Sequence, residues 1–249
     1  MLNILKNRPN LRKVICRVLN KTKSHIVYKG KVLGSLGLDW AKDDEIFELS
    51  EQALLSPLSF MHTDASPKLI FDIGASCGIS TTFLSHQKPS AQIRAYEPRE
   101  DAFVRLKKRL GQLRGNHCCH HAALDLEEGS VRLQDHGVGT SLSANNEKTF
   151  SAQTLAVDKE ISFPCSMEVL IKIDVEGAED RLLPQILPKL NSRSVLLLET
   201  HHPLSMVHEY AKPFLSKGFV WNQVRYRDLP EHGGPFLDWL VTGKDIKTN

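Results

Sequence analysis

The sequence is poor in cysteine and in long apolar runs. Its five cysteines are odd in number and form no Cys-x-x-Cys pair, which argues against a disulfide framework and indicates a reducing compartment, the cytoplasm. No stretch approaches the roughly 18 consecutive apolar residues of a membrane helix. The N-terminus also lacks the apolar block of a secretory signal. We therefore expect a globular protein without a membrane span.

An excess of charge of one sign is also missing. The chain has 32 Lys and Arg against 29 Asp and Glu, a net charge of +3, which is too small to indicate nucleic acid as a partner. Basic residues nevertheless dominate the start, because a series of them precedes the first acid, Asp39: Lys6, Arg8, Arg12, Lys13, Arg17, Lys21, Lys23, Lys29 and Lys31. We expect residues 1–63 to form a helical extension that acts as a lid or a dimer arm, which leaves a homodimer open. Residues 64–249 are expected to form the main domain.

From Lys68 onward, short apolar runs alternate with amphipathic helical segments. The runs that predict strands are Leu69–Ile73, Gln92–Tyr96, His117–Leu124, Val169–Asp174 and Val195–Thr200. This alternation predicts a doubly wound α/β fold, in which a mostly parallel sheet has helices on both faces. Two further runs without a helix between them, Phe219–Tyr226 and Pro235–Val241, predict an antiparallel hairpin at the sheet edge. Ligands of such folds bind beyond the carboxyl ends of the strands.

The first strand end carries a glycine turn, Asp72-Ile73-Gly74-Ala75-Ser76-Cys77-Gly78. Gly74 permits a sharp turn, and Gly78 lets the next helix begin close to a ligand. The turn differs from the dinucleotide fingerprint G-x-G-x-x-G, because Ser76 stands where the second glycine should be. Glu97 ends the next strand, where an acid can accept hydrogen bonds from both ribose hydroxyls. Together, the glycine turn and Glu97 argue against NAD and favour a nucleoside cofactor without a pyrophosphate, such as S-adenosylmethionine.

The fourth and fifth strand ends add charged residues. Lys172 and Asp174 point to the same side of their strand, and a Lys inside an apolar strand is either paired or functional. His201 is a candidate general base near neutral pH. Asp174, Glu199 and His201 could also hold a divalent metal such as Mg²⁺, although we do not favour a metal.

The run from His117 to His121 does not fit a structural zinc site. Because neighbouring residues of a strand face opposite sides, His117, Cys119 and His121 are the most that could converge, and structural zinc usually has four ligands. We interpret this run as a buried strand.

Taken together, these motifs resemble the FkbM-type methyltransferases over about residues 68–202. The likeness rests on the glycine turn, Tyr96-Glu97-Pro98, Ala122-Ala123-Leu124 and above all Lys172-Ile173-Asp174-Val175-Glu176-Gly177-Ala178-Glu179. It implies a Rossmann-like class I methyltransferase with a seven-stranded sheet whose last strand is antiparallel.

The resemblance also assigns residues to the cofactor. It implies that Asp72, Gly74, Ser76 and Gly78 line the methionine end of S-adenosylmethionine. Glu97 would hold the ribose, and Ala122 would lie on the adenine side. Asp174 would stand at the reacting centre. The chain departs from the family pattern at Ser76 and His121, where Asn is usual, and the second change affects the adenine contact.

The expected reaction is O-methylation of a hydroxyl on a sugar or small natural product, so that the partner is a small-molecule or glycan acceptor. His201 or Asp174 would take the hydroxyl proton, and Lys172 would orient Asp174 or lower the pKa of the acceptor. Two alternatives stay open. One is an RNA 2′-O-methyltransferase that uses the basic N-terminus. The other is a methyltransferase-like protein that binds a partner without catalysis.

Overall fold

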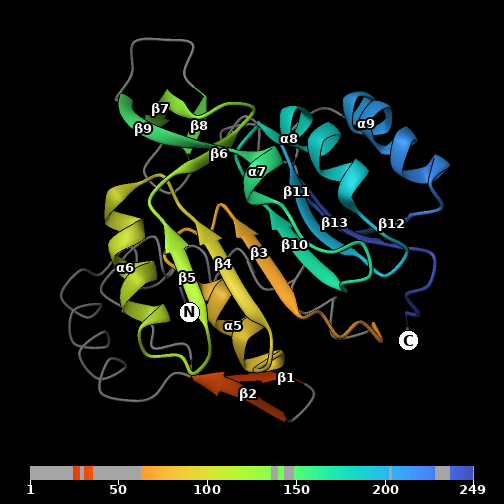
Figure 1. The fold of residues 1–249 in the computed structure, drawn as a ribbon, viewed down its shortest axis with the longest axis horizontal. Helices are drawn as coiled ribbons and strands as arrows, with labels where there is room; N and C mark the ends of the chain where they lie inside the picture. Colours follow the sequence, from red (N-terminus) through yellow and green to blue (C-terminus); the bar gives the residue numbers. More distant parts are fainter. Residues whose placement is uncertain are drawn as a thin grey trace.

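The structure is a computed structural model that describes residues 25–28, 31–35, 63–135, 140–142, 149–201, 204–227 and 236–248. Its centre is a seven-stranded sheet with the strand order β12-β13-β11-β10-β3-β4-β5 (Figure 1). The strands of this sheet are β3 (Leu69–Ile73), β4 (Gln92–Tyr96), β5 (His117–His120), β10 (Val169–Ile173), β11 (Val195–Thr200), β12 (Val220–Arg227) and β13 (Phe236–Thr242).

The sheet is parallel except at β13. β3 pairs in parallel with both β4 and β10, and the parallel pairing continues to β5 on one side and to β11 on the other. β13 is antiparallel to β11 and to β12. The predicted α/β fold with a mostly parallel seven-stranded sheet and an antiparallel terminal hairpin is therefore confirmed. The antiparallel strand lies one place inside the edge, because β12 forms the edge itself.

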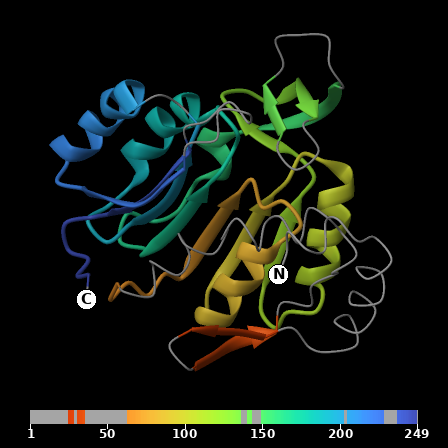
Figure 2. The ribbon, with the colours of Figure 1, turned by 180° about the vertical axis from the view of Figure 1, so that it is seen from behind.

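Helices cover both faces of this sheet. They are α5 (Ile79–Gln87), α6 (Glu100–Leu110), α7 (Val157–Glu160), α8 (Glu179–Ile186), α9 (Leu204–Ser216) and the 3₁₀ turn η1 (Leu187–Lys189). Alternation along β3 separates the two faces, since Leu69 and Phe71 pack in the core under α8 and α9, whereas Ile70 packs against α5. Figure 2 shows α5 in front of β3 and β4. None of the helices described here has the length and apolar character needed to cross a membrane.

A second, four-stranded sheet lies at the end of the molecule toward which the parallel strands point (Figure 1). Its strand order is β6-β9-β7-β8, with β6 (Ala123–Asp125), β7 (Gly129–Asp135), β8 (Thr140–Leu142) and β9 (Thr149–Ala156). The predicted strand 117–124 is therefore wrong at its end. β5 stops at His120, and after a bend at His121 and Ala122 the chain continues in β6 of the other sheet.

The N-terminal extension is described only in part. Its described residues form a two-stranded antiparallel sheet of β1 (His25–Tyr28) and β2 (Lys31–Ser35), and β2 lies against α5. The rest of the expected helical extension lies outside the described residues, and the division at residue 63 stays a prediction.

Candidate functional site

The glycine turn after β3 is held between the ends of its two neighbouring strands. Gly74 has a φ of +75°, and a Cβ at this position would lie 1.7 Å from the backbone oxygen of Asp174, so the turn passes directly against the end of β10. On the other side, the N–H groups of Gly74 and Ala75 both donate to the carbonyl of Tyr96 at 3.0 Å. Glycine is required here by both the backbone conformation and the close approach.

Ser76 and Gly78 continue the turn into α5. Ser76 adopts a φ of +48°, an uncommon conformation for a residue with a side chain. Gly78 has a φ of +85° and is the N-cap of α5. A Cβ on Gly78 would lie 2.8 Å from Cδ1 of Leu106, so this glycine also allows the turn to pack closely on α6.

Glu97 connects the glycine turn to the end of β4. One carboxylate oxygen accepts the N–H of Ser76 and the other accepts the N–H of Arg99, both at 2.8 Å. The residue is 6% exposed. A carboxylate has about four lone-pair sites and can accept several donors at once, ribose hydroxyls among them. The predicted role of Glu97 as the ribose ligand is compatible with this geometry and stays a prediction.

Asp72 and Lys172 form a buried ion pair beneath the turn. The Lys172 Nζ lies 3.4 Å from Asp72 Oδ1 and 3.5 Å from Asp174 Oδ2, and it donates to the carbonyl of Gly74 at 2.7 Å. Asp72 Oδ2 also accepts the hydroxyls of Ser80 and Thr81 in α5. Asp72 is fully buried and holds the turn and Lys172, and its predicted contact with the cofactor stays a prediction. The 3.5 Å distance from Lys172 to Asp174 is compatible with the expected role of Lys172 in orienting Asp174, and this role stays a prediction.

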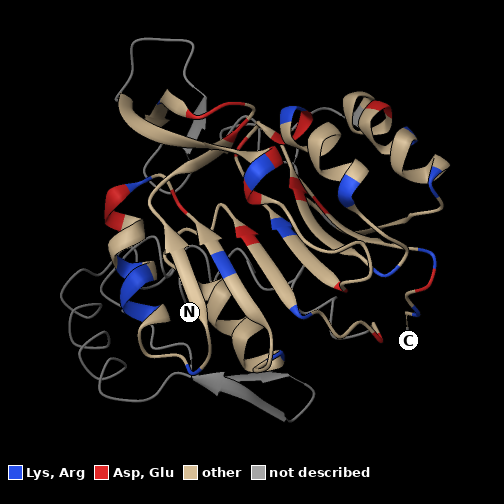
Figure 3. Cartoon of the chain, viewed as in Figure 1, with Lys and Arg blue, Asp and Glu red and all other residues tan. Residues whose placement is uncertain are grey.

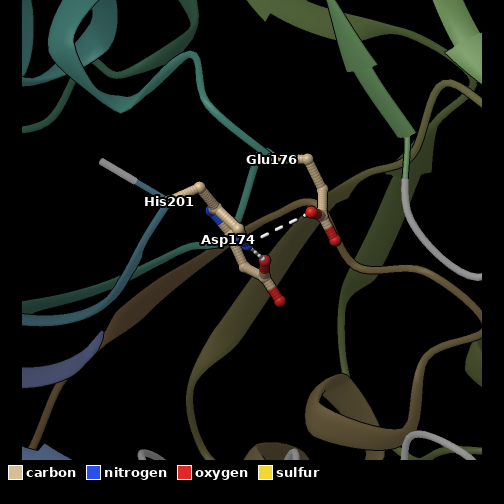
Figure 4. A group of neighbouring side chains, drawn as sticks. All are labelled: Asp174, Glu176 and His201. Atoms are coloured by element: carbon tan, nitrogen blue, oxygen red, sulfur yellow. Dashed lines mark ion pairs between the residues drawn. The ribbon is translucent and has the colours of Figure 1, made fainter. Parts of the chain in front are cut away.

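A cluster of acids surrounds His201 at the ends of β10 and β11 (Figure 4). The Nδ1 of His201 lies 2.8 Å from Oε1 of the fully buried Glu179, the first residue of α8. The Nε2 of His201 faces the other acids: Glu176 Oε2 at 3.2 Å, Glu199 Oε1 at 3.5 Å and Asp174 Oδ1 at 4.0 Å. The structure therefore brings Asp174, Glu199 and His201 together, as the sequence analysis expected.

The electrostatics of this cluster change the expected role of His201. Burial lowers the pKa of the imidazole, but the charge of Glu176 and hydrogen bonds to Glu179 and Glu199 outweigh it, so that the pKa of His201 is raised well above its ordinary value. Burial raises the pKa of Glu176 to about 7, against the opposing effect of His201. Burial and the charge of Glu199 raise the pKa of Asp174. The raised pKa favours the protonated imidazole, which disfavours His201 as a general base.

Glu176 is a site residue that the sequence analysis did not select. It stands in the turn between β10 and α8 with a φ of +53°, followed by Gly177 with a φ of +105°. This turn brings its carboxylate to His201. The signal in the sequence was an acid directly before a glycine at a strand end, a pattern of turns in which side-chain direction cannot be assigned from strand alternation. The ligand atoms of Asp174, Glu176 and His201 all lie within 4.8 Å of one another, so these three residues could hold a metal ion.

A hollow of about 730 Å³ opens at the start of α6, next to Glu97 in the sequence. It is lined in part by Pro98, Arg99, His121 and Phe150. The ring of His121 stacks on the ring of Phe103, with 4.8 Å between the ring centroids. The next residue, Ala122, is buried, with 4% of its surface exposed. The ends of β4 and β5 thus share one open space, on the side where the resemblance places the adenine.

Comparison with known proteins gives a likeness at the level of fold. No protein-family model matches the sequence, and no curated protein matches it. Among solved structures, methyltransferase FkbM from Methylobacillus flagellatus is 15% identical, with a TM-score of 0.48, over 70% of this chain. The present chain spans 44% of the length of that FkbM chain.

Two further structures give a similar picture. Precorrin-6y C5,15-methyltransferase from Geobacter metallireducens is 12% identical, with a TM-score of 0.46, over 80% of this chain and 88% of its own. TYW2 from M. jannaschii in complex with AdoMet is 12% identical, with a TM-score of 0.44, over 88% of this chain and 84% of its own. At these identities and TM-scores the structures carry no argument about function, which must come from the site itself.

Proposed function

We propose that the chain is an S-adenosylmethionine-dependent methyltransferase of the FkbM type that methylates a hydroxyl group on a sugar or small natural product. One observation carries the proposal. The glycine turn contacts Glu97 through the N–H of Ser76 on one side and the end of β10 at Asp174 on the other. A nucleoside bound to Glu97 across this turn would therefore extend toward the acids around His201.

The charge of the site supports a sulfonium cofactor. A pyrophosphate needs a close approach to the backbone at the second glycine of its fingerprint, and Ser76 occupies that position. The carboxylates of Asp174, Glu176 and Glu199 would repel a phosphate, whereas they would attract the positive sulfonium of S-adenosylmethionine. The resemblance to the FkbM type comes from the sequence motifs and is part of this proposal.

In the proposed reaction the acceptor oxygen attacks the methyl carbon of the sulfonium. The new C–O bond forms as the S–C bond breaks, the bonding electrons return to sulfur, and a neutral thioether leaves. The hydroxyl proton passes to a carboxylate of the cluster. We assign this role to Asp174, which is 30% exposed and lies 3.5 Å from Lys172, because the raised pKa of His201 favours the protonated imidazole. The remaining work of the protein is to align the acceptor and exclude water.

No observation in the described residues favours the two alternatives. The RNA reading depends on the basic N-terminus, and the basic residues before Asp39 have no described side chains. A non-catalytic binding protein would need none of the ordered contacts among Glu97, Ser76, Lys172 and Asp174. The acceptor, a homodimer and a cytoplasmic location stay predictions.

Calorimetric titration with S-adenosylmethionine and with its demethylated product tests the proposal. Wild type should bind both saturably, and Glu97→Ala should weaken binding about tenfold or more, since it removes hydrogen bonds to a charged group. Glu97→Gln, which keeps one acceptor oxygen, should be intermediate. Glu128→Ala, at an exposed ion pair with Lys159, should match wild type. Folded wild-type protein that binds neither ligand would overturn the proposal.

A further inference from the structure

His201 and the acids around it have the composition of a metal site as well as of a proton-transfer site. Two carboxylates and one imidazole converge from separate elements: Asp174 after β10, Glu176 in the following turn and His201 after β11 (Figure 4). We propose that these three residues bind a divalent cation of the Mg²⁺ and Mn²⁺ class. The oxygen-rich set with a single nitrogen suits these hard cations.

The distances between the side chains fit such an ion. With metal–ligand bonds of about 2.1 Å, adjacent ligands of an octahedral ion lie about 3.0 Å apart and opposite ligands about 4.2 Å apart. The His201 Nε2 lies 3.2 Å from Glu176 Oε2 and 4.0 Å from Asp174 Oδ1, within this range. All three ligand atoms lie within 4.8 Å of one another, so small side-chain movements would complete the geometry.

The imidazole is already oriented for this role. Glu179 is fully buried and contacts His201 Nδ1 at 2.8 Å, and its Oε1 also accepts the N–H of Gly177 at 3.2 Å. Fixing Nδ1 in this way directs Nε2 toward Asp174 and Glu176. Histidine ligands of metals are commonly held by a carboxylate on their other nitrogen. The His201 side chain is only 9% exposed, so its direction is determined by the protein and not by solvent.

The charge balance gives an independent reason for a cation. Four carboxylates surround His201, and the neighbouring cation Lys172 is shared with the buried Asp72. An ion can reach the site, because the side chains of Asp174 and Glu176 are 30% and 34% exposed.

The consequence for catalysis rests on the proposed function. A divalent cation beside Asp174 would bind the acceptor hydroxyl, lower its pKa and hold it in line with the sulfonium methyl. With Asp174 engaged as a ligand of the cation, Glu199, at 3.5 Å from His201, would receive the acceptor proton in place of Asp174.

Titration of the full chain with Mn²⁺, followed by electron paramagnetic resonance after prior removal of metals by a chelator, tests the cation site. We expect one saturable Mn²⁺ per chain, displaced by Mg²⁺. Glu176→Gln should weaken binding about tenfold or more, and Glu179→Gln about 10–100-fold by releasing the imidazole. Glu209→Gln, at an exposed ion pair with Lys212, is the matched control and should leave the affinity unchanged.

Absence of saturable binding to folded wild type would overturn the inference, as would equal affinity in Glu176→Gln and wild type. If Glu176→Gln fails to fold, Asp174→Asn is titrated instead, and an Mn²⁺ affinity equal to that of wild type would likewise overturn the inference. The titration contains no S-adenosylmethionine, so its outcome is independent of the calorimetric test of the methyltransferase proposal. Cation binding without cofactor binding, or the reverse, separates the two conclusions.

Discussion

Two glycines near the site share an unusual backbone conformation but differ in their surroundings. Gly74 and Gly177 have φ values of +75° and +105°. A Cβ on Gly74 would lie 1.7 Å from the backbone oxygen of Asp174, whereas a Cβ on Gly177 would meet nothing within 4 Å. The cost of a side chain at Gly177 is therefore conformational alone, and at Gly74 a steric conflict between two strand ends is added.

We predict that Gly74→Ala destabilises the protein by about 3 kcal/mol or more, because both the conformation and the contact with Asp174 are violated. Gly177→Ala should cost about 1–2 kcal/mol, the penalty of the left-handed conformation alone. Urea unfolding of the two variants measures the difference. Equal losses would mean that the turn moves away from β10 without cost.

At the level of elements, β3 and β10 are joined by charge as well as by backbone hydrogen bonds. Asp72 and Lys172 are direct partners in the parallel register, so their side chains lie on the same face of the sheet. The flanking residues Ile171 and Ile173 lie in the core on the other face. The pair thus places two opposite charges inside an apolar sheet, where each buried charge is stabilised by its partner.

We predict that Lys172→Met destabilises the protein by about 3 kcal/mol or more, because it leaves the carboxylate of Asp72 buried without its cation. The double variant Asp72→Asn/Lys172→Met should recover part of this loss, since it removes the uncompensated charge. Chemical denaturation of the single and double variants tests the coupling. Strictly additive losses would show that the two side chains are energetically independent.

The elements that the sequence predicted well are strands of the parallel sheet. β3, β4 and β11 were predicted with their observed bounds. β3 and β11 carry apolar runs typical of buried parallel strands, whereas β4 alternates the partly buried Gln92 and Arg94 with the buried Ile93 and Ala95. The four-stranded sheet was not predicted, since its strands are mostly polar on one side and its register depends on tertiary pairing. The run from His117 to Leu124 reads as one strand, although it crosses between two sheets at His121.

The residues of the site were also predictable only in part. Residues at strand ends, such as Asp174 and His201, could be selected because parallel strands bring their carboxyl ends together. Glu176 could not, since its direction depends on a turn with a φ of +53°. The raised pKa of His201 also lay beyond the sequence, because it depends on Glu176, Glu179 and Glu199, which come from the turn after β10, from α8 and from β11.

At the scale of the whole molecule, charges of both signs are interspersed. Figure 3 shows Lys and Arg on α6, α7, β4 and β10, with Asp and Glu between them. α6 itself begins with Glu100 and Asp101 and ends with Lys107, Lys108 and Arg109, which complements its helix dipole. These basic residues have local electrostatic roles, and the acids gathered around His201 would repel a phosphate backbone.

This distribution predicts weak RNA binding by the full chain, whose net charge is +3. The dissociation constant for an RNA hairpin at physiological salt should stay in the non-specific range of about 10⁻⁴–10⁻⁶ M. Fluorescence anisotropy at low and at physiological salt measures it. A much tighter affinity that falls steeply with salt would mean that the basic residues before Asp39 form a phosphate-binding surface. The acceptor would then have to be sought among RNA 2′-hydroxyls.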